Sequence, residues 1–75
     1  MLTLKETIAK NLERIRKRNE WTHSEFAELL GINRTTLYLY ESGRRVMPTE
    51  LIYRMYKETG IEPNEVILEQ EDVKD

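Results

Sequence analysis

The residue types that most enzymes and metal sites need are scarce in this 75-residue chain. It has no cysteine and a single histidine, His23, which cannot form a zinc site without further ligands. Its 14 Asp and Glu residues fall mostly on predicted solvent faces, and no glycine-rich phosphate loop is present. A chain of this size also has little material to enclose a substrate pocket. We therefore expect no enzyme, no metal site and no cofactor.

A different chemistry is available from Arg34, Thr35, Tyr38 and Leu39. A guanidinium group can donate two hydrogen bonds to N7 and O6 of guanine, which contributes about 1–3 kcal/mol of discrimination between bases. Threonine and leucine methyl groups can contact the methyl group of thymine, and a tyrosine hydroxyl can donate to a phosphate. As an alternative to DNA contact, exposed Tyr38 and Leu39 could form part of a protein interface or cover a neighbouring helix.

The stretch THSEFAELLGINRTTLYLYESG, residues 22–43, must position these side chains. It contains two apolar stripes at helical spacing, and Gly31 falls between them. Thr22 with Glu25 forms a capping box that predicts a helix start, and Asn33 is a suitable N-cap for a second helix that begins at Arg34. The link of about three residues, with a glycine free to adopt positive φ, favours a helix-turn-helix over an antiparallel hairpin.

This stretch resembles the helix-turn-helix of the lambda-repressor-like, Cro/XRE class of DNA-binding domains. The matching positions are Thr22, Glu25, Phe26, Ala27, Gly31, Ile32, Leu37, Glu41 and Gly43. One position departs from the family pattern, because His23 stands where glutamine is usual. The resemblance implies an all-α, compact five-helix lambda-repressor-like domain whose helix-turn-helix is formed by helices 2 and 3.

The sequence before the motif predicts a first helix. Leu4, Ile8, Leu12 and Ile15 share one helical face, and a capping box at Thr3 places the helix start near Leu4. We expect the helix to end around residues 18–19, with Asn19 in the left-handed conformation, and Trp21 to pack partly into the core.

The sequence after the motif predicts two more helices. Pro48 suits the first turn of a fourth helix that ends at Gly60. Its inward residues are expected to be Leu51, Ile52, Met55 and Tyr56. A short fifth helix is expected over residues 63–68. We thus predict a DNA-binding domain over residues 1–68 and an acidic, frayed tail over residues 69–75.

Charge is distributed unevenly along the chain. The net charge is −2, but residues 1–45 carry nine Lys or Arg and six Glu, whereas residues 46–75 carry three Lys or Arg and eight Asp or Glu. The helix-turn-helix lies in the basic part, which is consistent with a nucleic-acid partner. The chain has no apolar run of about 20 residues and no secretory signal at its N-terminus, so we expect a cytoplasmic protein without a membrane partner.

The resemblance also implies which residues contact double-stranded DNA. Arg34, Thr35 and Leu39 match positions that contact bases in the major groove, with Tyr38 beside them. The expected phosphate contacts come from the start of the second helix and from the loop after the third, and they are Thr22, His23, Ser42, Arg44 and Arg45. Alternatives are open at this point: His23 could support Arg34 or be an ordinary solvated histidine, and the loop could be a solvated basic segment.

Two further assignments follow from the resemblance. Arg16 and Glu41 match an ion pair that orients the third helix relative to the first. The candidate dimer interface comprises Val46, Met47, Ile61, Val66, Ile67 and Leu68, although these residues could instead complete the core. The expected function is transcriptional regulation, usually repression, by a homodimer on a palindromic operator. The alternative is a protein-interaction module, such as an antitoxin-like or phage regulatory partner.

Overall fold

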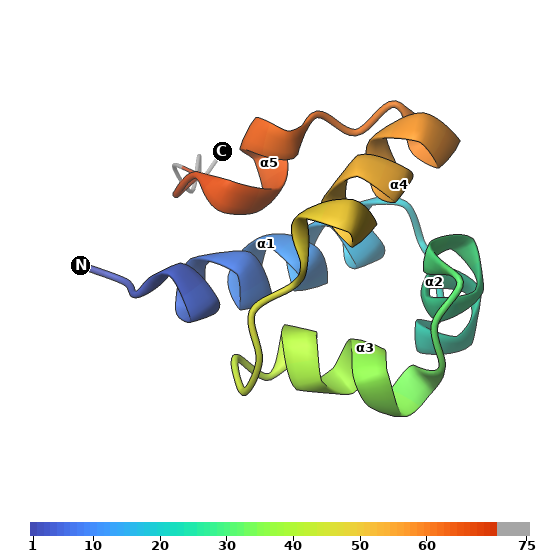
Figure 1. The fold of residues 1–75 in the computed structure, drawn as a ribbon, viewed down its shortest axis with the longest axis horizontal. Helices are drawn as coiled ribbons and strands as arrows, with labels where there is room; N and C mark the ends of the chain where they lie inside the picture. The colour runs from blue at the N-terminus through green and yellow to red at the C-terminus, as the bar shows by residue number, and fades with distance from the viewer. Residues whose placement is uncertain (71–75) are drawn as a thin grey trace.

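The computed structural model describes residues 1–70, which form five helices and no strand. They are α1 (Leu4–Arg18), α2 (His23–Leu30), α3 (Arg34–Glu41), α4 (Thr49–Thr59) and α5 (Pro63–Ile67). Figure 1 shows α1 crossing the middle of the molecule, with α4 and α5 on one side of it and α3 on the other, while α2 closes one end. This arrangement confirms the predicted all-α, five-helix lambda-repressor-like fold.

The helix starts follow local capping chemistry. Thr3 and Thr22 each accept a hydrogen bond from the backbone N–H three residues later, and Glu6 and Glu25 bond back to complete both predicted capping boxes. Asn33 Oδ1 accepts from Thr36 N at 2.8 Å, so α3 begins where the sequence predicts. Gly31, at φ +71°, closes α2 and provides the tight turn into α3.

The end of α1 differs from the prediction by one residue. Asn19 has φ −91° and is not left-handed; its side chain donates to Ile15 O at 2.8 Å. Glu20 takes the positive φ instead, at +56°. The amides of Glu20 and Trp21 then bond to Lys17 O and Arg16 O, which is the Schellman pattern with Glu20 in the left-handed position.

A shared core joins all five helices. It comprises Ile8, Leu12, Ile15, Phe26, Ala27, Leu30, Leu37, Tyr40, Met47, Ile52, Met55, Ile61 and Val66, with Trp21, Ile32 and Leu51 packed against it. The Trp21 and Phe26 rings lie 5.3 Å apart between centroids, which fixes the α1–α2 connection against the core.

Four residues depart from the sequence predictions. Leu4 and Tyr56, expected to point inward, are exposed, because Leu4 lies in the first turn of α1, beyond the buried face, and Tyr56 lies at the edge of the buried face of α4. Pro48 is the extended residue that precedes α4 and is not part of its first turn. Leu68 follows α5, which ends at Ile67. The expected tail falls partly outside the described residues, since residues 71–75 are not described.

Candidate nucleic-acid interface

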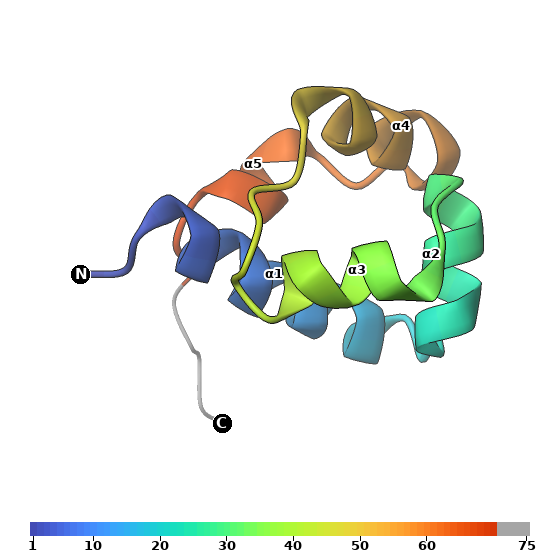
Figure 2. The same cartoon turned by 60° about the horizontal axis from the view of Figure 1, so that its bottom comes forward.

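Helix α3 lies along one border of the molecule, and its outer face carries the predicted contact residues. Turning the molecule brings α3 forward, flanked by α2 on one side and by the segment that leads to α4 on the other (Figure 2). Leu37 and Tyr40 are buried and fix the rotation of the helix about its axis. Arg34, Thr35 and Tyr38 are consequently exposed, whereas Leu39 is only half-buried and less available than the sequence suggested.

A shallow hollow links this face to the start of α2. It is lined by His23, Arg34, Thr35 and Tyr38. The structure thus brings together residues from both helices of the motif. His23 is the first residue of α2, and its predecessor Thr22 uses its hydroxyl to accept from Glu25 N at 3.1 Å.

The predicted ion pair between Arg16 and Glu41 is present in the structure. Arg16 Nε lies 3.2 Å from Glu41 Oε1, and the two side chains are 15% and 6% exposed. Arg16 also donates through Nη1 to Trp21 O at 3.3 Å. One guanidinium group therefore joins α1, the α1–α2 connection and the end of α3, which sets the position of the outer face of α3 relative to the rest of the molecule.

The loop after α3 holds its basic residues close to the same face. Gly43, at φ +75°, ends the helix, and the amides of Arg44 and Arg45 both donate to Leu39 O, at 3.0 and 3.2 Å. Arg44 and Arg45 are exposed, and Arg44 Cζ lies 6.0 Å from the centroid of the Tyr38 ring. Arg44 thus lies against Tyr38 on the outer face of α3, a relation that the sequence did not reveal. Ser42 Oγ bonds to Leu39 O at 3.3 Å.

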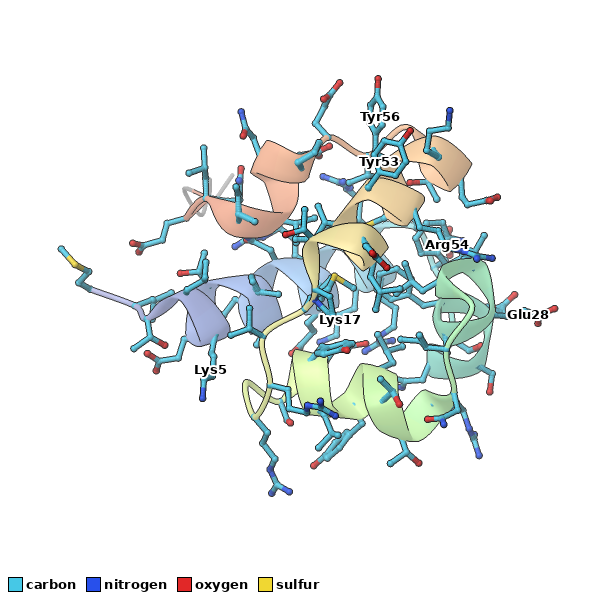
Figure 3. The ribbon with its side chains drawn as sticks, in the orientation of Figure 1. Lys5, Lys17, Glu28, Tyr53, Arg54 and Tyr56 are labelled. Atoms are coloured by element: carbon cyan, nitrogen blue, oxygen red, sulfur yellow. The ribbon has the colours of Figure 1, made fainter. Side chains whose placement is uncertain are left out.

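Lys5 is a basic residue near this loop that the sequence analysis missed. Its carbonyl lies 3.9 Å from where a Cβ atom on Gly43 would stand, so the first turn of α1 borders the loop. The Lys5 side chain extends from α1 toward the side of the molecule that carries α3 (Figure 3). No local sequence signal distinguishes Lys5 from other surface lysines, because its place depends on how α1 packs against the loop.

Arg54 and Asn11 make two further polar contacts between helices that the sequence analysis did not predict. Arg54, on α4, donates from Nε to Leu29 O at 3.2 Å and so satisfies a carbonyl in the last turn of α2 (Figure 3). Asn11 is buried and donates from Nδ2 to both Val66 O and Leu68 O at 2.8 Å, which attaches the end of α5 to α1. A polar residue on the apolar stripe between Ile8 and Ile15 was the available signal for Asn11.

The candidate dimer residues separate into two groups. Met47, Ile61 and Val66 are buried in the core of the single chain. They are therefore unavailable as an exposed contact surface. Val46, Ile67 and Leu68 are exposed.

The described residues offer neither a metal-binding cluster nor a membrane-spanning helix. Residues 1–70 contain no group of three or more His, Cys, Asp or Glu side chains that could hold a metal ion. None of the helices within those residues is long and apolar enough to cross a membrane.

Comparison with known proteins agrees with the geometry. A family model described as a helix-turn-helix domain matches residues 9–71. Antitoxin PezA from Streptococcus pneumoniae serotype 4 (strain ATCC BAA-334 / TIGR4) is 44% identical over 45 residues, which cover 60% of this chain and 28% of PezA. The chain thus matches less than a third of the length of this relative, and no solved structure matches it. Because the family model spans most of the chain, the chain belongs to the helix-turn-helix family of DNA-binding domains, of the lambda-repressor-like Cro/XRE type.

Proposed function

We propose that the chain is a sequence-specific regulator of transcription that inserts α3 into the major groove of double-stranded DNA. The observation that carries this proposal is the exposed face of Arg34, Thr35 and Tyr38 on a helix held by the largely buried Arg16–Glu41 pair. Rigid placement favours specificity because a base contact requires the donor atoms to meet the base edge in one orientation.

The proposed base contacts differ in chemistry. Arg34 donates two hydrogen bonds to one guanine, and Thr35 and Leu39 contact thymine methyl groups. Tyr38 packs against the sugar-phosphate backbone or the edge of a base, with Arg44 beside its ring. Leu39 is half-buried, so its contribution is smaller than that of Thr35.

Phosphate contacts on both sides of α3 supply most of the affinity. Thr22 and His23 lie at the start of α2, where free amides and the helix dipole favour an anion. Ser42, Arg44 and Arg45 lie beyond the other end of α3, and Lys5 extends this basic group onto α1.

We further propose that the chain binds a palindromic operator as a homodimer and represses transcription by covering a promoter. One recognition helix contacts only about four or five base pairs, which is too few to select a site among the many competitors in a genome. Two copies related by a twofold axis would contact half-sites about one helical turn apart. Val46, Ile67 and Leu68 are the exposed residues of the candidate interface.

A second candidate function is binding to a protein partner. The relative PezA is named an antitoxin, and Tyr53 and Tyr56 are exposed on α4 and project away from α3 (Figure 3). Tyrosine is enriched at protein interfaces. Such a contact on α4 would be compatible with DNA bound to α3.

Selection of bound sequences from random duplex DNA at two salt concentrations tests the proposed function. We expect a palindromic consensus and a strong loss of affinity at the higher salt concentration. Salt-sensitive binding without a consensus would contradict sequence-specific recognition. Absence of binding at low salt would contradict DNA binding and favour the protein partner.

A further inference from the structure

His23 lies between a buried carboxylate and the proposed DNA surface. Its Nε2 atom is 3.5 Å from Glu41 Oε1, and its side chain is 47% exposed. The same ring lines the hollow formed with Arg34, Thr35 and Tyr38. One edge of the imidazole therefore faces Glu41, while a large part of the ring is accessible to a ligand on the α3 side.

The Glu41 carboxylate receives fewer hydrogen bonds than its two oxygen atoms can accept. Oε1 receives the Nε–H of Arg16 at 3.2 Å, and that guanidinium group also serves Trp21 O. Oε2 is buried and has no hydrogen-bond partner among the described residues. A carboxylate that is 6% exposed and short of donors favours a second cation or donor nearby.

A neutral His23 ring cannot donate a hydrogen bond from both of its nitrogen atoms. A neutral imidazole carries one N–H, so a ring that donates to Glu41 through Nε2 presents an acceptor lone pair at Nδ1. A phosphate is also an acceptor and would be repelled there. An imidazolium donates from both nitrogens and can satisfy Glu41 and a phosphate together.

We propose that His23 binds one backbone phosphate of the DNA as an imidazolium that bridges this phosphate and Glu41, so that each protomer takes up a proton on binding. This inference rests on the proposed DNA-binding function and specifies the chemistry of one contact. The usual glutamine of the family can hydrogen-bond at this position but cannot take up a proton, so proton-linked binding would be specific to the histidine of this chain.

Charged groups of both signs surround His23, and some favour the imidazolium while others oppose it. Glu41 from α3 and Glu13 from α1 favour the imidazolium, and Glu13 is itself paired with Lys17 at 2.7 Å. Arg16 from α1 and Arg34 from α3 oppose it. Within α2, Glu25 is engaged by Thr22 N, and Arg54 from α4 contacts the opposite end of the helix. A DNA phosphate beside the ring would add a further negative charge and so favour the imidazolium in the complex.

The first test measures affinity for the selected operator between about pH 6 and pH 8, the range over which histidine changes its charge. It compares the wild type with His23→Gln at constant ionic strength. We expect wild-type affinity to fall with rising pH by up to about tenfold per unit for each protomer, which is the limit for one linked proton. His23→Gln should lose this dependence. The same pH dependence in both proteins would overturn the proposal.

The second test uses the fact that the chain contains one histidine. Its ring resonances can be followed by NMR in the free protein and in the operator complex without an assignment problem. We expect the titration midpoint of the ring to move to higher pH in the complex, by about one unit or more for an added phosphate at hydrogen-bond distance. An unchanged or lowered midpoint would overturn the proposal even where affinity varies with pH for other reasons.

Failure of this inference and failure of the proposed function give different results. A wild-type protein that binds its operator with the pH dependence of His23→Gln retains the proposed function and loses the proton-linked contact. A wild-type protein that binds no DNA at any pH contradicts both.

Discussion

Arg44 and Arg45 are adjacent arginines with different surroundings. Both are exposed in the loop after α3, but only Arg44 lies over the ring of Tyr38, at 6.0 Å from its centroid. A cation–π contact at an exposed site contributes about 0.5–1 kcal/mol, enough to bias where the ring lies. The sequence predicts the same role for both arginines, a contact with a DNA phosphate. We expect their substitution to have different effects on DNA binding.

We predict that Arg45→Ala weakens binding to all sequences alike, whereas Arg44→Ala also changes base preference at the positions near Tyr38. Loss of one phosphate contact should lower the magnitude of the salt dependence by about one unit in both variants. The measurement is affinity for the consensus and its single-base-pair variants at several salt concentrations. Identical base preferences in the two variants would show that Arg44 does not position Tyr38.

At the scale of elements, two ion pairs attach α1 to its neighbours in different environments. Arg16–Glu41 is largely buried, whereas Arg18 and Glu65 are 54% and 37% exposed although their 3.2 Å distance is the same. A buried charge that loses its partner is strongly destabilising, and an exposed pair contributes little.

We predict that Arg16→Met lowers the free energy of unfolding by on the order of 3 kcal/mol, because Glu41 would be left without its main donor. The matched change Arg18→Met should cost less than about 1 kcal/mol. Urea denaturation followed by circular dichroism measures both. Equal losses would mean that burial of the Arg16–Glu41 pair does not matter to stability.

The buried amide of Asn11 holds the end of α5. Asn11→Ala leaves Val66 O without its buried donor, and an unsatisfied buried polar group costs about 1–3 kcal/mol. We expect the backbone amide of Leu68, which bonds to Asn64 O, to exchange its hydrogen faster in this variant. The neighbouring change Lys10→Ala, at an exposed position of α1, is the control. Unchanged exchange at Leu68 would contradict the role of Asn11.

The capping boxes predict a dependence of stability on pH. The backbone N–H of Thr22, together with the Thr22 side chain, lowers the pKa of Glu25, and Thr3 lowers the pKa of Glu6 in the same way. Because each carboxyl has a lower pKa in the folded state, its contribution is present above the ordinary value of 4.5 and is lost as the pH falls.

We therefore expect the stability advantage of the wild type over Glu25→Gln to shrink as the pH falls below the ordinary value of 4.5 and the folded-state carboxyl takes up its proton. Glu6→Gln should behave similarly. Denaturant unfolding at a series of pH values provides the measurement. A constant difference between wild type and variant across this range would exclude the carboxylate as the stabilising group.

Most helix boundaries were predictable because caps act within four residues of sequence. Thr3, Thr22, Asn33 and Gly31 all perform their predicted roles. The predictions were wrong where tertiary packing determines the local conformation. The left-handed residue after α1 is Glu20, because the chain must turn there so that Trp21 packs against the core. The exposure of Leu4 and Tyr56 likewise depends on how far neighbouring elements extend over α1 and α4.

At the scale of the whole molecule, the sequence predicted the face of α3 but not its surroundings. Rotation of α3 follows from Leu37 and Tyr40, so the exposure of Arg34, Thr35 and Tyr38 was accessible to pattern analysis. The positions of Lys5, Arg54 and the His23–Glu41 contact arise from packing between residues far apart in the sequence. The same packing buries Met47, Ile61 and Val66, which removes them from the candidate dimer surface.

The central claim, that Arg34 contacts a guanine in the major groove, is tested most directly by changing both partners of that contact. The consensus guanine is replaced by 7-deazaguanine, which lacks the N7 acceptor, and affinity is measured for the wild type and for Arg34→Ala. We predict that the wild type loses about 1 kcal/mol or more, roughly fivefold in affinity, whereas Arg34→Ala is indifferent to the replacement. Equal losses in the two proteins, or no loss in the wild type, would contradict the proposed recognition by α3.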